Sequence, residues 1–268
     1  QLVKSAPDAY GISTEPHFYF IHAYNCIYEC SYCYLQGYFD SPDLVFFINH
    51  EDIQQEILEI ALQNPNSWFH AGEFSDSLAL SHVTKEWEGY FNLFKKLPSN
   101  KLELRTKSNN IKSILKLAPL PNIYISYSLS PADSAKNHDL KTPSLKLRLQ
   151  AMQQLANHGH ALGIHLDPMI YSPNFAIQYQ ELIEELFSYV THEQIHYVSL
   201  GTVRFTKDVY RATQQNYPTS SIHHQKFYPT FDQKLRYPKP LRFWMMGHVQ
   251  ELLLKHDLAK DKIYWCME

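Results

Sequence analysis

Three cysteines, Cys26, Cys30 and Cys33, lie within one short segment, NCIYECSYCYLQGYF. Their spacing is Cys-x3-Cys-x2-Cys, and they follow directly on an apolar stretch that is typical of a β-strand. Iron–sulfur clusters are normally held by cysteine thiolates, and a loop this short can direct three thiolates at three irons of one cubane. The fourth iron would then lack a protein ligand. The segment therefore predicts a [4Fe–4S] cluster with one open iron.

The same thiols have other interpretations. Three cysteines and one histidine, with His22 nearby, could hold zinc, although zinc sites more often use two separated pairs of ligands. Inert core cysteines are a second alternative. The remaining cysteine, Cys266, is a candidate for a fourth cluster ligand. The tight spacing favours a cluster with three protein ligands.

Short apolar stretches alternate with amphipathic ones along the chain. We expect strands at 17–23, 68–72, 101–106, 122–128, 161–166, 196–200 and 262–266, and helices at 51–63, 82–97, 110–117, 142–158, 175–189 and 241–256. Pro143 stands where a helix can begin, and Gly159 stands where one can end. Strands that alternate with helices predict a parallel sheet with right-handed crossovers. Roughly six such units are too few for an eight-fold barrel, so we predict an α/β partial barrel with its chemistry at the carboxyl ends of the strands.

The length of 268 residues suits a single α/β domain over residues 1–268. Residues 207–240 are the least regular stretch, and we expect an ordered loop or lid there. The first residue is Gln, which we take to indicate a processed or trimmed start. No apolar run approaches the ~20 residues that cross a bilayer, and residues 1–15 lack the pattern of a secretory signal. We therefore expect a cytoplasmic protein with no membrane partner.

The charge is nearly balanced, with 24 Lys and Arg against 27 Asp and Glu. A dedicated nucleic-acid binder usually carries a basic excess or a basic patch, and the composition has no general excess. With only 8 glycines and no glycine-rich phosphate loop, Rossmann and P-loop folds have no support. The scattered histidines, including His223 and His224, lack metal-ligand spacing.

The cysteine segment resembles the radical S-adenosylmethionine (SAM) superfamily, and the longer string C-x3-C-x2-CYLQ is similar to that of spore photoproduct lyase and its relatives. The resemblance implies a partial (β/α)6 barrel in which Cys26, Cys30 and Cys33 hold the cluster and the open iron binds SAM. It also implies an external one-electron reductant of flavodoxin or ferredoxin type. In that family tyrosines flank the third cysteine, so Tyr32 and Tyr34 are candidates for a radical relay.

Further segments match the family in the same order. His70-Ala71-Gly72-Glu73 resembles the Gly-Gly-Glu-type motif that takes the SAM ammonium, and Ser75-Asp76 resembles the family's Ser-Asp pair. The resemblance places Lys107 on the SAM carboxylate and Ser128 in contact with SAM. The expected SAM-binding residues are therefore Glu73, Ser75, Lys107 and Ser128. Two later segments also resemble family motifs: 165–169, on the adenine and substrate side, and Arg204-Phe205-Thr206.

One position departs from the family. The lyase uses a further cysteine to return a hydrogen atom to its product radical, and the matching position, two residues before the Ser-Asp pair, is Glu73 here. A carboxyl O–H is a poor hydrogen-atom donor compared with a thiol. Cys266, Tyr32 and Tyr34 are the candidate replacements.

Three hypotheses follow. The first is an enzyme of spore photoproduct lyase type, which cleaves SAM to a 5′-deoxyadenosyl radical and acts on a DNA photolesion flipped from the helix. The second keeps this radical chemistry but acts on a small molecule, a peptide or an RNA base. The third is a metal-binding protein without turnover.

Overall fold

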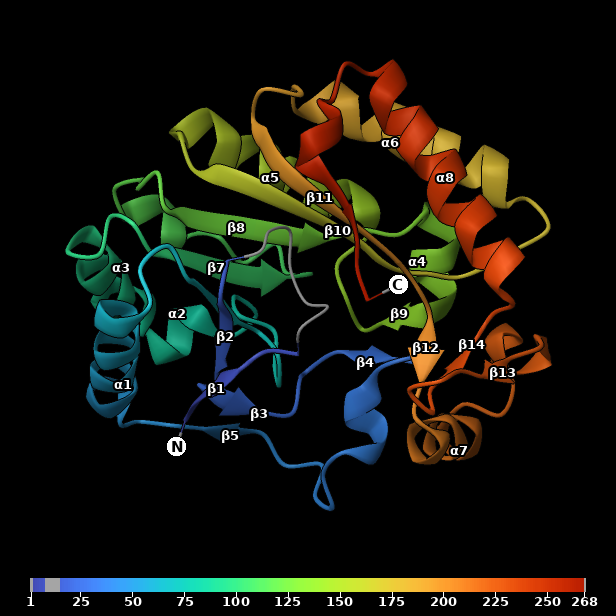
Figure 1. The fold of residues 1–268 in the computed structure, drawn as a ribbon, viewed down its shortest axis with the longest axis horizontal. Helices are drawn as coiled ribbons and strands as arrows, with labels where there is room; N and C mark the ends of the chain where they lie inside the picture. The colour runs from blue at the N-terminus through green and yellow to red at the C-terminus, as the bar shows by residue number, and fades with distance from the viewer. Residues whose placement is uncertain (1, 8–14, 268) are drawn as a thin grey trace.

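The structure, a computed structural model, describes residues 2–7 and 15–267. The expectations for residues 1–15 fall partly outside these positions. Eight strands form one curled sheet in the order β1-β2-β6-β7-β8-β10-β11-β15 (Figure 1). They are β1 (Val3–Ser5), β2 (His17–Phe20), β6 (Trp68–Ala71), β7 (Lys101–Thr106), β8 (Ile123–Ser128), β10 (Ala161–Met169), β11 (Ile195–Thr202) and β15 (Ile263–Trp265). Neighbours from β2 to β15 run parallel, whereas β1 is antiparallel to β2.

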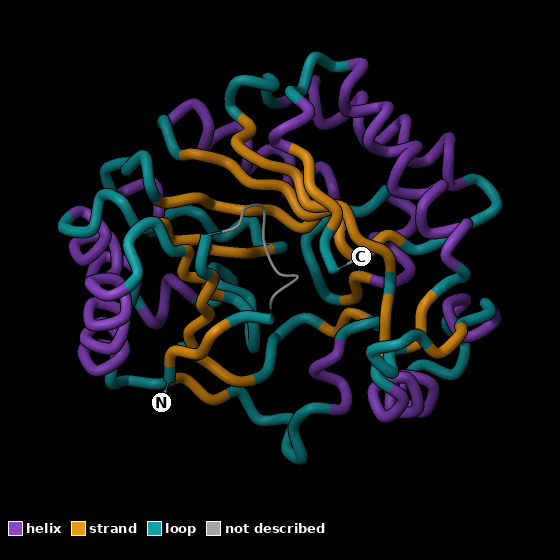
Figure 2. The backbone as a smooth tube through the Cα atoms, in the orientation of Figure 1, coloured by secondary structure: helices purple, strands orange, loops and turns teal. Residues whose placement is uncertain are grey.

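Helices connect the parallel strands and cover the outer side of the curled sheet, as Figure 2 shows. They are α1 (His50–Gln63), α2 (Ser81–Thr84), α3 (Trp87–Lys95), α4 (Ala132–His138), α5 (Leu145–His158), α6 (Phe175–Tyr189) and α8 (Lys239–Lys255). This alternation confirms the partial barrel expected from the sequence. No helix in the described part of the chain is both long and apolar enough to cross a membrane.

Burial explains why each stretch takes its form. In α1, Ile53, Ile57 and Ala61 recur at four-residue spacing and are buried, so one face of the helix packs inward. Strands β8 and β10 are buried along most of their length, as parallel strands covered on both faces should be. Each large apolar side chain removed from water in this way stabilises the fold by about 1.5–3 kcal/mol.

Two helix predictions were wrong in part. The helix expected at 82–97 is divided into α2 and α3 at Lys85, whose φ of 54° is left-handed. The helix expected at 110–117 is reduced to one 3-10 turn, η2 (Ile114–Lys116). Apolar spacing alone carries no information about such a break, because Lys85 is an ordinary helix-forming residue.

Short pairings hold the loop that carries the cysteines. Strand β3 (Ala23–Tyr24) pairs with β5 (Val45–Phe46), and β4 (Glu29–Cys30) pairs with β9 (Asp139–Leu140). The 3-10 turn η1 (Tyr34–Gly37) follows the third cysteine. The β4–β9 pair joins segments far apart in the sequence, so local pattern could not predict it.

Residues 207–240, expected as a loop or lid, contain regular structure. The elements are α7 (Lys207–Asn216), η3 (Ser221–His224), β13 (Tyr228–Pro229) and β14 (Leu235–Arg236), and β14 lies between β13 and β12 (Arg204–Phe205) in a small sheet. Helix α7 packs on η1, where the Gln36 amide donates to the Tyr217 hydroxyl at 3.1 Å (Figure 1). The segment therefore packs against the turn that follows the third cysteine, and its action as a lid stays a prediction.

Candidate functional site

The cysteine loop has a defined backbone. Asn25, immediately before Cys26, has a left-handed φ of 62°, and its amide donates to the carbonyls of Ser41 and Asp43 at 2.9 and 2.6 Å. Asparagine tolerates this conformation better than most residues. The second cysteine, Cys30, is fixed by the β4–β9 pair. The loop is thus anchored before its first cysteine and at its second.

The three thiols are placed as a group. Cys30 is buried, while Cys26 and Cys33 are partly exposed, and none of the three forms a disulfide. Burial raises the pKa of Cys26 to about 12, with further contributions from Asp76 and from Cys33. Burial also raises the pKa of Cys30 and Cys33, and the cation of Lys107 counteracts it at both. The thiols therefore lie close enough to influence one another, and Cys30 and Cys33 share Lys107 as a cationic neighbour.

This donor set suits a cluster. Thiolates are the ligands that iron–sulfur clusters use, and iron binding would displace the protons that burial keeps on these sulfurs. Over residues 2–7 and 15–267, no group of three or more His, Cys, Asp or Glu side chains is arranged to hold a single metal ion. In a cubane, by contrast, each thiolate would bind a different iron.

His22, the histidine of the zinc alternative, is buried against other partners. Its ring lies edge-on to Trp87, with 5.2 Å between ring centres, and its Nδ1 is 3.7 Å from Glu86. Burial lowers the pKa of His22 to about 3, and His50 adds to the effect. The ring is therefore neutral in the folded protein.

This neutral histidine gives a pH-dependent stability. Below pH 6.5 His22 binds a proton in the unfolded chain but stays neutral in the folded protein. The free energy of unfolding therefore falls by roughly 1.4 kcal/mol per pH unit until the pH nears the native pKa of about 3. We expect wild type to lose stability relative to His22→Leu by that slope in urea unfolding between about pH 6 and about pH 4. Parallel stability profiles for the two proteins would contradict the assignment.

Asp76 joins the ends of β6 and β7. Its carboxylate accepts hydrogen bonds from the backbone N–H groups of Leu78, Ala79 and Lys107 at 3.0, 2.9 and 2.6 Å, and from the Thr106 hydroxyl at 2.7 Å. The sequence indicated Asp76 only as part of a motif. The structure shows that it fixes the backbone at Lys107.

Glu73 lies beside the cysteine loop. Gly72 has a φ of 90°, and a Cβ there would meet the Arg105 carbonyl at 2.9 Å, so the turn before Glu73 requires glycine. The Tyr34 hydroxyl donates to the Glu73 carbonyl, and the Glu73 charge contributes to raising the pKa of Cys33. Ser75, in the same turn, is half-buried.

Lys107 lies near two of the thiols, those of Cys30 and Cys33. Its ammonium is 5.7 Å from the centre of the Tyr32 ring. Burial lowers the pKa of Lys107, but Cys30 and Asp139 raise it by more, and the net pKa is above that of an ordinary lysine. The structure thus brings Glu73 and Lys107, two charges of opposite sign, near Cys33.

Tyr32 belongs to a buried network that sequence reasoning missed. Its hydroxyl donates to Asp139, which forms an ion pair of 2.8 Å with the fully buried Arg148. Arg148 also donates to the Ser128 carbonyl at 3.0 Å, which fixes the end of β8. Burial, and then the charge of Asp139, raise the pKa of Tyr32 well above that of ordinary tyrosine. Tyr34, in contrast, is 37% exposed.

A buried carboxylate, Glu103, organises the barrel interior. Its five hydrogen-bonding partners, which with it form the Glu103 cluster, are His70, Arg105, Ser126, His165 and Tyr197. Burial raises the pKa of Glu103, but Arg105 and the two histidines lower it by more, so the carboxylate stays ionised. A Cβ on Gly163 would meet the Tyr197 ring at 2.3 Å, so glycine in β10 makes room for Tyr197 to reach Glu103.

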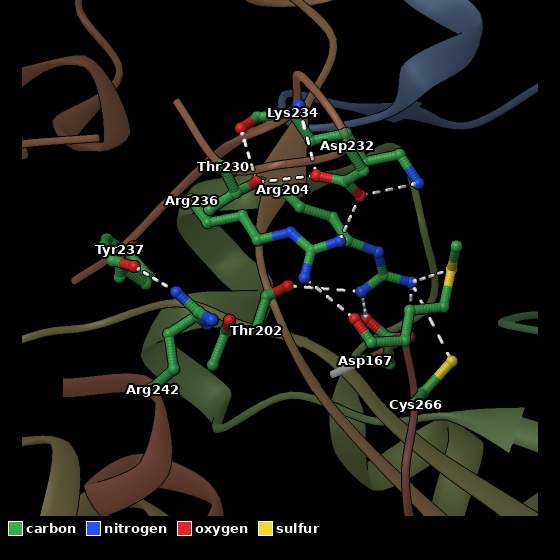
Figure 3. A network of polar contacts seen from close by, with 11 residues as sticks. Asp167, Thr202, Arg204, Thr230, Asp232, Lys234, Arg236, Tyr237, Arg242 and Cys266 are labelled. Carbon is green, nitrogen blue, oxygen red and sulfur yellow. Dashed lines mark hydrogen bonds and ion pairs between the residues drawn. The ribbon is translucent and has the colours of Figure 1, made fainter. Parts of the chain in front are cut away.

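Cys266 lies immediately after β15, at the carboxyl end of the sheet. Its N–H donates to the Leu200 carbonyl at 2.8 Å, and its sulfur is 3.9 Å from the Arg204 guanidinium. Arg204 in turn binds Asp167 through two contacts of 2.9 and 3.1 Å (Figure 3). The structure therefore places Cys266 with Asp167 and Arg204, from the two later motif segments. Its role as fourth cluster ligand or hydrogen donor stays a prediction.

Comparison with known proteins bears on this arrangement. A family model described as spore photoproduct lyase matches residues 13–237. The chain is 24% identical over 205 residues to the spore photoproduct lyase of Bacillus subtilis (strain 168), and 26% identical over 207 residues to that of Geobacillus sp. (strain Y412MC61). Each match covers 75% of this chain but only 60% of the relative's length.

Two solved structures share the fold. Spore photoproduct lyase complexed with dinucleoside spore photoproduct matches with a TM-score of 0.81 at 20% identity, over 92% of this chain and 75% of that one. The Streptococcus suis protein SuiB bound to S-adenosylmethionine matches with a TM-score of 0.56 at 16% identity, over 93% of this chain and 49% of that one.

Proposed function

The chain belongs to the spore photoproduct lyase family, and from that premise we propose that it is a radical SAM enzyme whose cluster is held by Cys26, Cys30 and Cys33. The observation that supports the proposal is the gathering of the three thiols in one loop, with Lys107 near Cys30 and Cys33 and with Glu73 near Cys33. When bound, the cluster and SAM would supply a 5′-deoxyadenosyl radical that abstracts hydrogen from a substrate.

The two charged residues suit the amino-acid end of SAM. A carboxylate is a good partner for an ammonium, so Glu73 would take the SAM amino group. Lys107 would take the SAM carboxylate as a compact point charge, with its backbone held by Asp76. The hydroxyls of Ser75 and Ser128 would complete the contacts.

Removal of the Lys107 charge tests this assignment. A hydrogen bond to a charged group contributes about 1.5–3 kcal/mol, so Lys107→Met should weaken SAM binding by roughly 10–150-fold. Equilibrium binding of SAM to the anaerobically reconstituted protein measures the change. The exposed Lys112 is the matched control, and Lys112→Met should bind SAM as wild type does. Equal affinity in all three proteins would remove Lys107 from the SAM site.

Cys266 is the proposed source of the hydrogen atom returned to the product radical. It is the one cysteine outside the triad, and a thiol is a better hydrogen-atom donor than the Glu73 carboxyl group. Tyr32 and Tyr34 are the proposed relay residues. A Cys266→Ser variant should form 5′-deoxyadenosine but fail to return hydrogen to the substrate, whereas unchanged product would exclude this thiol.

The proposed substrate is a DNA photolesion, because the curated relatives are named spore photoproduct lyases. A second candidate is a different substrate, such as a small molecule, a peptide or an RNA base, and the presence of Glu73 where the lyase has its donor cysteine favours it. Either enzyme would take its electron from an external flavodoxin- or ferredoxin-type reductant, and we propose a cytoplasmic location. A metal-binding protein without turnover is the competing proposal.

One assay separates these proposals. The protein is reconstituted anaerobically with iron and sulfide, dithionite and SAM are added, and 5′-deoxyadenosine is measured with and without DNA that contains spore photoproduct. SAM cleavage with repair supports the lyase, and cleavage without repair supports the second candidate. A colourless protein that forms no 5′-deoxyadenosine would overturn both.

A further inference from the structure

The thiol of Cys266 faces an ion pair at the mouth of the barrel. Figure 3 shows the Arg204 guanidinium between the carboxylate of Asp167 and the sulfur of Cys266. The next residue along the chain is held as well: Arg204 donates to the Met267 sulfur at 3.4 Å, and Arg236 donates to the Met267 carbonyl at 2.9 Å. The segment after β15 is therefore fixed by two arginines.

The backbone makes room for this ion pair. A Cβ on Gly201 would lie 2.6 Å from the carboxylate carbon of Asp167, so a larger residue at position 201 of β11 would displace that carboxylate. Asp167 is also held through both of its carboxylate oxygens, because the Arg204 guanidinium donates to each of them. Packing against Gly201 and the two hydrogen bonds therefore fix the position of Asp167 relative to Arg204, which in turn contacts the Cys266 sulfur.

The charges around the thiol come from four elements. Asp167 extends from β10, Arg204 from β12 and Arg105 from β7, and the phenol of Tyr264 from β15 lies near the sulfur. Burial first, and then Asp167, raise the pKa of Cys266 to about 12 against the lowering effect of the two arginines. Without Asp167, two cations would face the sulfur and favour its thiolate form.

This balance matters for chemistry. Hydrogen-atom transfer to a carbon radical breaks the S–H bond homolytically and forms a C–H bond, which leaves a thiyl radical on sulfur. A thiolate has no hydrogen atom to give, so a donor thiol beside an arginine needs that cation neutralised.

We propose that Asp167 is a positioning residue that neutralises Arg204 and so keeps Cys266 in its hydrogen-donating thiol form. This inference rests on the proposed function, in which Cys266 returns the hydrogen atom. Arg204 contacts the Cys266 sulfur, and the negative charge of Asp167 offsets the tendency of Arg204 to favour the Cys266 thiolate.

A double-mutant cycle tests the proposal in the reconstituted holoenzyme, where the triad cysteines are bound to iron. Alkylation of Cys266 by iodoacetamide is followed across pH by mass spectrometry of its peptide, because only the thiolate reacts. Asp167→Asn should increase the alkylation rate about tenfold or more at about pH 9 and move the midpoint of the profile to lower pH. Asp167→Asn combined with Arg204→Gln should restore the wild-type midpoint, because the pair is again neutral.

A merely structural role for the pair gives a different result. Loosened packing would expose the sulfur and relieve the burial that raises its pKa, so the midpoint would move to lower pH in the double variant as well as in Asp167→Asn. A double variant that does not restore the wild-type midpoint would therefore overturn the proposal. If Asp167→Asn does not fold, Arg204→Gln alone decides: it should slow alkylation several-fold at about pH 9, and an unchanged or faster rate would overturn the proposal. The alkylation profile of Cys266 tests this inference, whereas 5′-deoxyadenosine formation tests the proposed function, so the failure of one is distinguishable from the failure of the other.

Discussion

Replacement of Cys30 by Ala should reduce 5′-deoxyadenosine formation by at least roughly 10³-fold, the scale on which an enzyme loses its central catalytic group. Cys30 is the buried member of the triad, and the β4–β9 pair fixes its backbone. With two thiolates left, the loop cannot hold three irons of one cubane. The measurement is 5′-deoxyadenosine formed per chain after anaerobic reconstitution, alongside iron content.

The control is an equivalent truncation in the same loop. Leu44 lies in that loop, is 39% exposed and is outside the proposed site. Leu44→Ala should retain iron and SAM cleavage near wild-type levels. A Cys30→Ala protein that still binds a full cluster and cleaves SAM would show that Cys30 is not a ligand, and Cys266 would then need testing as its replacement.

Replacement of Glu103 by Leu should lower the free energy of unfolding by about 3–5 kcal/mol, the usual cost of leaving a buried charge network without one partner. The variant removes the buried carboxylate that five buried or half-buried side chains bond. Urea unfolding of the metal-free protein measures the loss. Glu184 is the matched control, since it is exposed on α6, where it accepts a hydrogen bond from Gln180 at 2.9 Å, so Glu184→Leu should change stability by less than about 0.5 kcal/mol.

The loss should also depend on pH. The native pKa of Glu103 lies below that of an unfolded glutamate, so its contribution is complete above the unfolded value of 4.5 and disappears as the pH falls through the native one. The gap between wild type and Glu103→Leu should therefore narrow in acid. A Glu103→Leu protein as stable as wild type at neutral pH would mean that the apolar surroundings alone support the barrel.

The part of the site that sequence could predict is local. The spacing of Cys26, Cys30 and Cys33 is contained in eight residues, and the expected strand ends placed Glu73 and Lys107 at one edge of a parallel sheet. The structure confirms that edge, because β6 and β7 are parallel neighbours that end beside the cysteine loop.

The part that sequence could not predict depends on side chains that meet across the fold. Asp139 reaches Tyr32 only because β4 pairs with β9, and Cys266 reaches Asp167 only because β15 joins β11. Gly163 and Gly201 give no local signal either. Each makes room for a side chain from a neighbouring strand, and that requirement is visible only once the register is known. A local signal was present for α7, since Thr206 caps it by accepting from the Val209 N–H.

The central claim is that the three-cysteine loop holds a SAM-binding [4Fe–4S] cluster. Electron paramagnetic resonance of the anaerobically reconstituted, dithionite-reduced protein tests it most directly. We predict the signal of a reduced [4Fe–4S] cluster that changes shape when SAM is added, and that is absent in Cys30→Ala. A protein that binds zinc in place of iron, or a cluster signal that SAM leaves unchanged, would contradict the claim.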